Sequence, residues 1–274
     1  MNNLTKRILT GALLIIIITS AIRGGSISFI LLTLTINLLA LHEFYHLFHS
    51  YTGSLRQVTG IMLSLCLVIT FALFITNRSD WKILLINIPL AFGIFIRELY
   101  LKSQTPFHNL AFIFTGIICI TIPLCFFTSI AFLPIREAVY NYEIVLGYFF
   151  ILWASDSGAF LIGKYFGRHH LFERISPGKT WEGSLGGMFC ALLVAYTTSY
   201  FFTSLNFINW IIIALIITVT GTFGDLIKSL MKRSLHIKDS GTILPGHGGM
   251  LDRFDTLLGS ATFIFCFLVL FLYA

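Results

Sequence analysis

Charge is scarce in this chain of 274 residues. Asp, Glu, Lys and Arg together make up 11% of it, whereas a soluble globular domain has about a quarter. No hydrophilic block long enough to fold by itself separates the apolar runs, which excludes a separate soluble domain. Because 57% of the residues are hydrophobic, we predict an integral membrane protein whose residues 1–274 form a single membrane domain.

The cysteines lack the spacing that metal or redox chemistry requires. The sequence contains no CxxC pair and no Cys/His pattern typical of a zinc site. All five cysteines lie inside apolar runs, and we interpret them as packing or lipid-facing residues: Cys66, Cys119, Cys125, Cys190 and Cys266.

Uncharged runs recur along the chain at lengths that suit a bilayer, which a helix of about 20 residues crosses. The run 183–224 is too long for one crossing, and the polar triplet Ser204-Leu205-Asn206 predicts a turn that divides it. We therefore predict an all-α, polytopic bundle of about nine transmembrane helices. The predicted spans are 8–22, 26–41, 58–77, 83–96, 110–132, 144–163, 184–204, 210–226 and 257–274.

The first apolar run has two interpretations. Lys6 and Arg7 precede it and small residues end it near Ala21, as in a secretory signal. Because eight further apolar segments follow, we interpret the run as a retained span.

Basic residues are distributed unevenly between the two sides of this nine-helix arrangement. With the N-terminus inside, only four of the 18 Lys and Arg residues lie outside: Arg23, Arg78, Lys82 and Arg136. Cytoplasmic loops carry such an excess of positive charge. The net charge of +6 therefore needs no nucleic-acid partner, and both charged loops of the C-terminal half face the cytoplasm.

Those two loops and the helix ends beside them concentrate the ionisable groups of the C-terminal half. Residues 229–255 read SLMKRSLHIKDSGTILPGHGGMLDRFD, and seven of the 12 carboxylates in the chain lie between residues 156 and 255. Carboxylates suit Mg²⁺, whereas Lys and Arg suit phosphate oxygens. Glycines within 245–249 let the backbone approach an anion closely. The pattern predicts a metal ion together with a phosphorylated ligand.

An alternative is a solvated loop that sets topology and contacts anionic lipid headgroups. Asp156 and Asp225 argue against it, because both lie within or at the ends of apolar helices. A carboxylate without a partner costs several kcal/mol there (about 2.5 to 3.5 on insertion scales).

The motifs in these loops resemble the signature of the phosphatidate cytidylyltransferases, also called CDP-diglyceride synthases. The resemblance extends over roughly residues 153–256, with no departure in the signature segment, and the N-terminal half adds a compatible helix count. The matching segments are 156–160, 167–168, 175–183, 224–226, 229–233, 238–241 and 245–255.

This resemblance implies transfer of the cytidylyl group of CTP to phosphatidic acid, which gives CDP-diacylglycerol and pyrophosphate. It implies a dependence on Mg²⁺ and leaves open whether a second, monovalent cation assists. It further implies a homodimer among membrane lipids, in a bacterial plasma (inner) membrane, with the active site facing the cytoplasm. On this basis residues 1–143 are N-terminal helices, and 144–274 are catalytic helices and cytoplasmic loops.

Site roles follow from matching the residues to this reaction. Asp225 and Asp252 are the first choices for metal ligands, because they can converge from the end of one helix and the start of the next; Asp239 and Asp255 come second. The predicted catalytic residues are Lys232, Arg233, Lys238, Asp239, His247 and Arg253. The predicted substrate-binding residues are Asp156, Arg168, Ser176, Lys179, Thr180, Glu182, Gly248 and Gly249.

Simpler roles stay open for several of these residues. Each cation also suits a plain contact with the lipid surface. His247, which lies close to three glycines, also suits a bond to the backbone. Ser176 and Thr180 either bind phosphate or cap the helix that follows Pro177.

Two other classes of protein compete with this interpretation. His42-Glu43-Phe44-Tyr45-His46 has the HExxH form of zinc metalloproteases, which suits an intramembrane protease. No convincing third ligand follows, so we interpret His42, Glu43 and His46 as interfacial residues at the cytoplasmic end of the second helix. An anionic-solute transporter would line a pathway with the same charges, but no matching cluster precedes residue 150.

Overall fold

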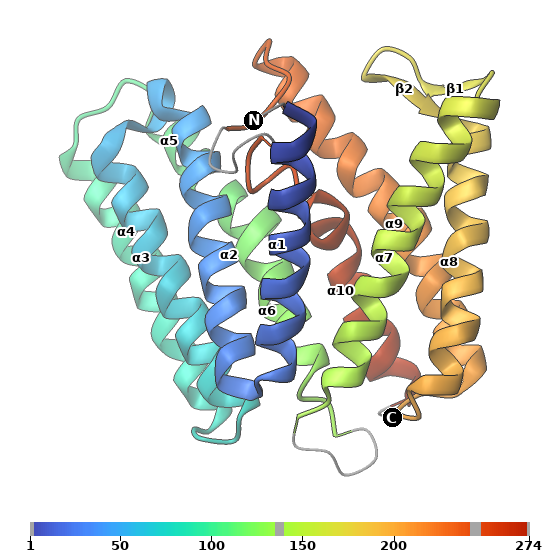
Figure 1. Cartoon of the computed structure of the whole chain (residues 1–274). Coiled ribbons are helices and arrows are strands. Elements are labelled where there is room, and N and C mark those ends of the chain that lie inside the picture. The colour runs from blue at the N-terminus through green and yellow to red at the C-terminus, as the bar shows by residue number, and fades with distance from the viewer. Residues whose placement is uncertain (1–2, 135–139, 242–247, 273–274) are drawn as a thin grey trace. The chain divides into compact units, whose positions relative to one another are not determined.

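The computed structural model describes residues 3–134, 140–241 and 248–272 (Figure 1). The chain divides into two compact units. Unit 1 contains Met1–Phe132 and Ser240–Asp252, and unit 2 contains Leu133–Asp239 and Arg253–Ala274.

Unit 1 consists of helices and one returning segment of the C-terminal half. Its elements are α1 (Asn3–Arg23), α2 (Ser26–Leu47), α3 (His49–Ile75), η1 (Trp81–Ile86), α4 (Asn87–Tyr100), α5 (Pro106–Gly116), η2 (Ile117–Thr121) and α6 (Ile122–Ile130). Gly25, with φ +108°, separates α1 from α2, and a left-handed backbone of this kind favours glycine. The elements α5, η2 and α6 run on as one apolar length, Pro106–Ile130.

Polar side chains join the helices of unit 1 inside its apolar core. The Asn37 side chain on α2 donates to Ser64 Oγ on α3 at 2.8 Å, and Ser64 pairs with the Thr121 hydroxyl at 2.8 Å. The Tyr45 hydroxyl donates to the carbonyl oxygen of Ile113 at 2.8 Å. Such bonds satisfy polar groups that lipid would leave unpaired, and they hold neighbouring spans in register.

Unit 2 combines four long helices with a small hairpin. Its elements are α7 (Tyr142–Phe166), β1 (His170–Phe172), β2 (Ser176–Thr180), α8 (Trp181–Phe201), α9 (Phe207–Ser234) and α10 (Asp255–Leu272). Strands β1 and β2 are antiparallel. Asn141 caps α7, and Asn206 caps α9 through a bond from the Asn209 amide to its side-chain oxygen.

Glycines let the helices of unit 2 approach each other closely. A Cβ atom added to Gly187 on α8 would lie 2.7 Å from the Ser155 carbonyl oxygen on α7. A Cβ atom on Gly224 of α9 would lie 2.6 Å from the Cα atom of Gly259 on α10. Small residues at helix crossings are typical of membrane proteins, and the second crossing lies beside the functional residues.

The predicted all-α membrane architecture is confirmed. Eight helices of the described residues are long and apolar enough to cross a membrane, and Leu9–Arg23 forms a shorter apolar helix. The turn predicted at 204–206 separates α8 from α9. Helix α9, however, continues to Ser234, beyond the predicted end at 226, because hydropathy marks where the apolar stretch stops and not where backbone hydrogen bonds stop. The hairpin was not predicted.

Candidate functional site

Three carboxylates gather in unit 2, one from each of three helices. Asp156 lies on α7, Asp225 lies on α9, and Asp255 is the first residue of α10. A hydrogen bond joins the carboxyl groups of Asp225 and Asp255, and Asp156 interacts electrostatically with both. Thr256 Oγ1 lies 3.5 Å from Asp156 Oδ1 and 3.4 Å from Asp255 Oδ1, so its hydroxyl links two of these carboxylates.

The close crossing of α9 and α10 brings Asp225 beside Asp255. Gly224 directly precedes Asp225, and its contact Gly259 follows Asp255 by about one helical turn. A side chain at either glycine would separate the helices and, with them, the two carboxyl groups. The two glycines therefore allow the close helix crossing that brings the two carboxylates together.

Basic and hydroxyl groups surround the carboxylates. Lys179 Nζ, at the end of β2, lies 2.5 Å from Asp225 Oδ2, and each of these two side chains is 26% exposed. Ser229 Oγ donates to Asp225 Oδ1 at 3.3 Å. Lys232 interacts electrostatically with Asp225, and Arg253 with Asp156. Three cations thus face three carboxylates, a balance that suits a bound metal ion and an anion better than either alone.

The residues fit a divalent metal ion that takes few protein ligands. Among the described residues, no three His, Cys, Asp or Glu side chains form a ready metal-binding group. The Asp225 and Asp255 carboxyl groups are nevertheless within hydrogen-bonding distance, which requires a proton or a cation between them. Mg²⁺ uses one or two carboxylates together with waters and substrate phosphates, so this pair matches its needs.

The β1–β2 hairpin and its flanks carry several predicted substrate-binding residues. Thr180 Oγ1 accepts a bond from the Gly183 amide at 3.1 Å, so Thr180 caps α8 and Ser176 does not. Ser176 instead pairs with Phe172 across the hairpin. The helix begins at Trp181, and the hairpin holds Lys179 next to Asp225.

Glu182 organises the chain that leads into this hairpin. Its Oε2 atom accepts bonds from the amides of Arg168 at 3.1 Å and His169 at 3.2 Å. Its Oε1 atom lies 2.6 Å from His169 Nδ1. The Arg168 side chain itself is exposed. Glu182 therefore positions the backbone of Arg168 and His169, in addition to any contact that it makes with a substrate.

The basic residues at and after the end of α9 differ in their contacts. Arg233 Nη1 donates to the Ile237 carbonyl oxygen at 3.2 Å, and Nε donates to the Ile175 carbonyl oxygen at 3.4 Å. Arg233 thus ties the end of α9 to the hairpin. Lys238 and Asp239, which follow, are exposed.

Asp252 belongs to unit 1, where it accepts bonds from the backbone. Its Oδ2 atom accepts from the Ser240 amide at 2.8 Å and from the Gly249 amide at 3.4 Å. Gly248 has φ +82°, a conformation that side chains rarely adopt. Asp252 was a first-choice ligand beside Asp225, but the carboxylate that unit 2 brings to Asp225 is the second choice, Asp255. His247 lies outside the described residues.

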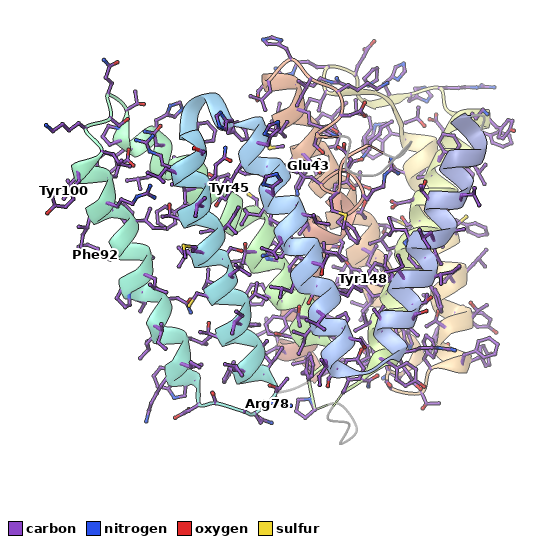
Figure 2. The ribbon with its side chains drawn as sticks, turned by 60° about the vertical axis from the view of Figure 1, so that its left-hand side comes forward. Glu43, Tyr45, Arg78, Phe92, Tyr100 and Tyr148 are labelled. Carbon is purple, nitrogen blue, oxygen red and sulfur yellow. The ribbon has the colours of Figure 1, made fainter. Side chains whose placement is uncertain are left out.

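Glu43 is the residue that sequence reasoning misjudged. It is only 3% exposed, so the interpretation of Glu43 as interfacial is wrong. Its Oε2 atom accepts from the Met250 amide at 2.6 Å, and the Ser240 hydroxyl donates to Oε1. Figure 2 shows Glu43 on α2. A carboxylate in an apolar helix needs partners. The position of Glu43 in an apolar run was therefore the signal from which its burial against partners could have been predicted.

The geometry of the HExxH segment does not suit a protease. His42 and His46 are exposed, with ring centroids 6.4 Å apart. Glu43 is buried against Gly249, with its oxygens committed to Ser240 and Met250. The glutamate that would have to serve as the base therefore already accepts hydrogen bonds that fix the backbone at Ser240 and Met250.

The chain is similar to known proteins along nearly its whole length. Residues 5–271 match the model of the Cytidylyltransferase family. The chain is similar to the phosphatidate cytidylyltransferase of Bacillus subtilis (strain 168), with 31% identity over 279 residues that cover 99% of this chain and 100% of the relative. It is also similar to the phosphatidate cytidylyltransferase of Staphylococcus aureus (strain COL), with 33% identity over 250 residues that cover 89% and 91%.

Proposed function

Because the chain belongs to the cytidylyltransferase family, we propose that it transfers the cytidylyl group of CTP to phosphatidic acid. The products are CDP-diacylglycerol, a precursor for phospholipid synthesis, and pyrophosphate. The family match over residues 5–271 carries this conclusion. The grouped carboxylates and cations of unit 2 supply the chemistry that two phosphorylated substrates need, whereas the protease and transporter alternatives have no support.

The reaction needs no protein nucleophile. An oxygen of the lipid phosphate attacks the α-phosphorus of CTP, the new P–O bond forms, and the bond to the β-phosphate breaks so that pyrophosphate leaves. The protein brings two anions together and compensates the charge on the attacking and leaving oxygens. Positioning and charge compensation are sufficient for a phosphoryl-type transfer.

Enzymes of this family generally use a divalent metal. We assign Mg²⁺ to Asp225 and Asp255, with Asp252 and Asp239 as further ligands. Bound there, the ion would neutralise charge on the phosphate oxygens of CTP. Whether a second, monovalent cation assists is a separate question that a comparison of potassium and sodium salts answers.

The cations beside the carboxylates bind the phosphates in this proposal. Lys179 and Lys232 lie next to Asp225, and Arg253 lies near Asp156. On this ground we assign all three to the triphosphate. The exposed Lys238 and Arg168 contact either phosphate, and Arg233 acts by holding the hairpin.

The remaining predicted residues contribute acceptors, donors and backbone. Asp156 orients the substrate beside Asp225, and Glu182 and Thr180 hold the hairpin that carries Lys179. Ser176, on the same strand, offers a hydroxyl to phosphate. The amides of Gly248 and Gly249 and the ring of His247 are assigned to phosphate contacts.

The protein is an integral membrane protein in contact with lipid. We place it in a bacterial plasma membrane, because the similar proteins come from bacteria. The active site faces the cytoplasm in this proposal, where CTP is made, and the chain forms one membrane domain and a homodimer. Cross-linking in native membranes tests the dimer.

Label transfer from CTP into lipid is the direct test. Detergent-purified protein is incubated with CTP labelled in the cytidine, phosphatidic acid and Mg²⁺, and label is counted in the lipid phase. Lipid-soluble label is expected, and it should disappear with EDTA or when diacylglycerol, which lacks the attacking phosphate, replaces phosphatidic acid. No transfer from folded wild-type protein would contradict the proposed function.

A further inference from the structure

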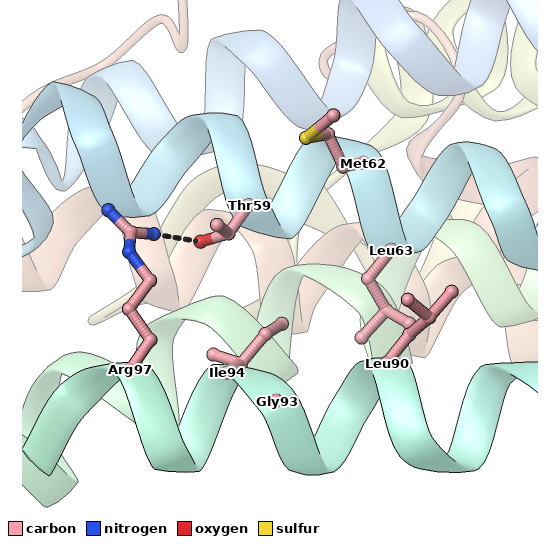
Figure 3. Close-up of a pocket in the computed structure, with 7 residues that line it drawn as sticks. All are labelled: Thr59, Met62, Leu63, Leu90, Gly93, Ile94 and Arg97. Atoms are coloured by element: carbon pink, nitrogen blue, oxygen red, sulfur yellow. Dashed lines mark hydrogen bonds between the residues drawn. The ribbon is translucent and has the colours of Figure 1, made fainter.

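A groove lies between α3 and α4 on unit 1, and none of the residues that line it is assigned to the reaction (Figure 3). Its volume is about 340 Å³, within the range of about 300–1,000 Å³ typical of small-molecule sites. The lining is apolar except for one hydroxyl and one guanidinium. The lining residues are Thr59, Met62, Leu63, Leu90, Gly93, Ile94 and Arg97.

Arg97 marks one end of this groove with a fixed positive charge. Its Nη1 atom donates to Thr59 Oγ1 at 2.8 Å and to the Leu55 carbonyl oxygen at 3.0 Å, which holds the guanidinium against α3 (Figure 3). Both acceptors are neutral, so these bonds orient the side chain without cancelling its charge. An orientated arginine is a ready partner for a phosphate group.

The neighbouring acid does not cancel the Arg97 charge. Glu98 interacts electrostatically with Arg97, but it is bound by Arg56 through Nε at 2.9 Å and Nη2 at 2.8 Å. Asn109 also donates to Glu98, at 3.1 Å. Two arginines therefore share one carboxylate, which leaves this end of the groove with one net positive charge.

Gly93 keeps the floor of the groove open. It lies within α4, where glycine costs about 1 kcal/mol relative to alanine, and a Cβ atom built on it would meet nothing within 4 Å. Packing within the chain therefore does not require glycine here. A ligand chain that lies over Gly93 does require it, because any side chain would occupy the same space.

The groove opens toward lipid. Met62 and Phe92, on the outer surfaces of α3 and α4, are each 64% exposed (Figures 2 and 3). Two lengths of chain on this surface are long and apolar enough to cross a membrane: Gly53–Ile75 in α3, and Trp81–Tyr100, which combines η1 and α4. The molecules that meet this surface are lipids, and basic pockets between transmembrane helices bind phosphorylated headgroups.

We propose that this groove binds an anionic phospholipid of the surrounding membrane. The lipid phosphate contacts the Arg97 guanidinium, and one acyl chain lies over Gly93 between Leu63 and Leu90. The apolar lining accounts for the chain, and the uncompensated charge accounts for preference for an anionic headgroup over a zwitterionic one.

The test measures binding of phosphatidylglycerol, which lacks the phosphomonoester that attacks CTP in the proposed reaction, so the result is independent of cytidylyl transfer. Delipidated protein in detergent is titrated with phosphatidylglycerol or phosphatidylcholine, and retained lipid is counted by native mass spectrometry. Arg97→Gln should weaken phosphatidylglycerol binding about tenfold, as loss of a charged hydrogen bond predicts, and remove its advantage over phosphatidylcholine. Gly93→Leu should weaken the binding of both lipids.

Matched variants separate this site from general effects on the surface. Arg78→Gln removes an arginine elsewhere on unit 1 (Figure 2), and Phe92→Leu changes the outer surface of α4 without filling the groove; both should bind like the wild type. If Arg97→Gln fails to fold, Arg97→Lys and Gly93→Leu still decide the matter. Equal binding by wild type and Gly93→Leu would overturn the proposal, as would dissociation of a dimer as the only effect of the groove variants.

Discussion

At the scale of single residues, the carboxyl pair of Asp225 and Asp255 is the centre of the proposed metal site. We expect Asp225→Asn and Asp255→Asn each to lower kcat at least about 100-fold, because each removes charge that would hold the ion opposite the phosphates. Label transfer into lipid measures the effect. Replacement of both His42 and His46 by alanine should leave the rate nearly unchanged, since both are exposed and neither is assigned a role in the reaction.

Asp252 provides a second comparison at this scale. The Asp252→Asn protein should insert into the membrane and lose turnover, whether Asp252 binds metal or only holds the amides of Ser240 and Gly249. The two roles differ in metal dependence. A ligand's loss should raise the Mg²⁺ concentration for half-maximal activity, whereas a purely structural loss should lower the maximal rate alone. Retained turnover would remove Asp252 from the site.

Glu43 is predicted to position the segment that carries Asp252. Glu43→Gln keeps the size of the side chain but weakens its bonds to Ser240 and Met250, each bond to a charged group contributing about 1.5–3 kcal/mol. We expect kcat to fall about tenfold or more and the Mg²⁺ requirement to rise. In Ser240→Ala protein the same substitution should have a smaller effect, because the two side chains act on one bond.

General destabilisation would give a different result for Glu43. Fewer molecules would be active, but the half-saturating Mg²⁺ concentration of the active ones would stay at the wild-type value. Additive effects of Glu43→Gln and Ser240→Ala would likewise rule out positioning through their shared bond.

At the scale of elements, the crossing of α9 and α10 supports the site. Gly259→Ala places a Cβ atom 2.6 Å from the Cα atom of Gly224, so the helices must separate. Overpacking of this kind costs about 1–3 kcal/mol, and the separation should also move Asp255 away from Asp225. We expect a lower unfolding temperature in detergent and a lower kcat.

Gly93→Ala is the matched control for stability, because its Cβ atom meets nothing and alanine favours helix by up to about 1 kcal/mol. Its unfolding temperature should equal or exceed that of the wild type. An unchanged unfolding temperature for Gly259→Ala would mean that the crossing relaxes easily and does not set the carboxyl pair.

At the scale of the whole molecule, the distribution of basic residues predicts which loops face the cytoplasm. A cysteine introduced at Arg78 should react with a membrane-impermeant maleimide added to intact cells, and one introduced at Lys238 should react only after permeabilisation. Both positions are exposed in the structure, so access to reagent decides the labelling. The reverse pattern would place the proposed active site outside and contradict the orientation.

Much of this protein could be predicted from its sequence, because hydropathy and charge are local properties. The apolar runs predicted the membrane spans, the triplet 204–206 predicted the turn between α8 and α9, and the motifs predicted the family. Local chemistry also led to the predicted site residues, most of which now have described partners. Helix ends such as Ser234 were missed, because helices continue past the apolar stretch.

Which of these residues meet depends on the packing of segments that are distant in the sequence. Asp255 lies beside Asp225 because two glycines let α9 and α10 cross closely, and such a crossing depends on how distant helices rotate against each other. Glu43 is buried because a segment some 200 positions further along the chain folds back onto α2. Local hydropathy and motif chemistry therefore specify the membrane fold, the family and the groups available for chemistry, whereas packing between helices specifies the partners of those groups.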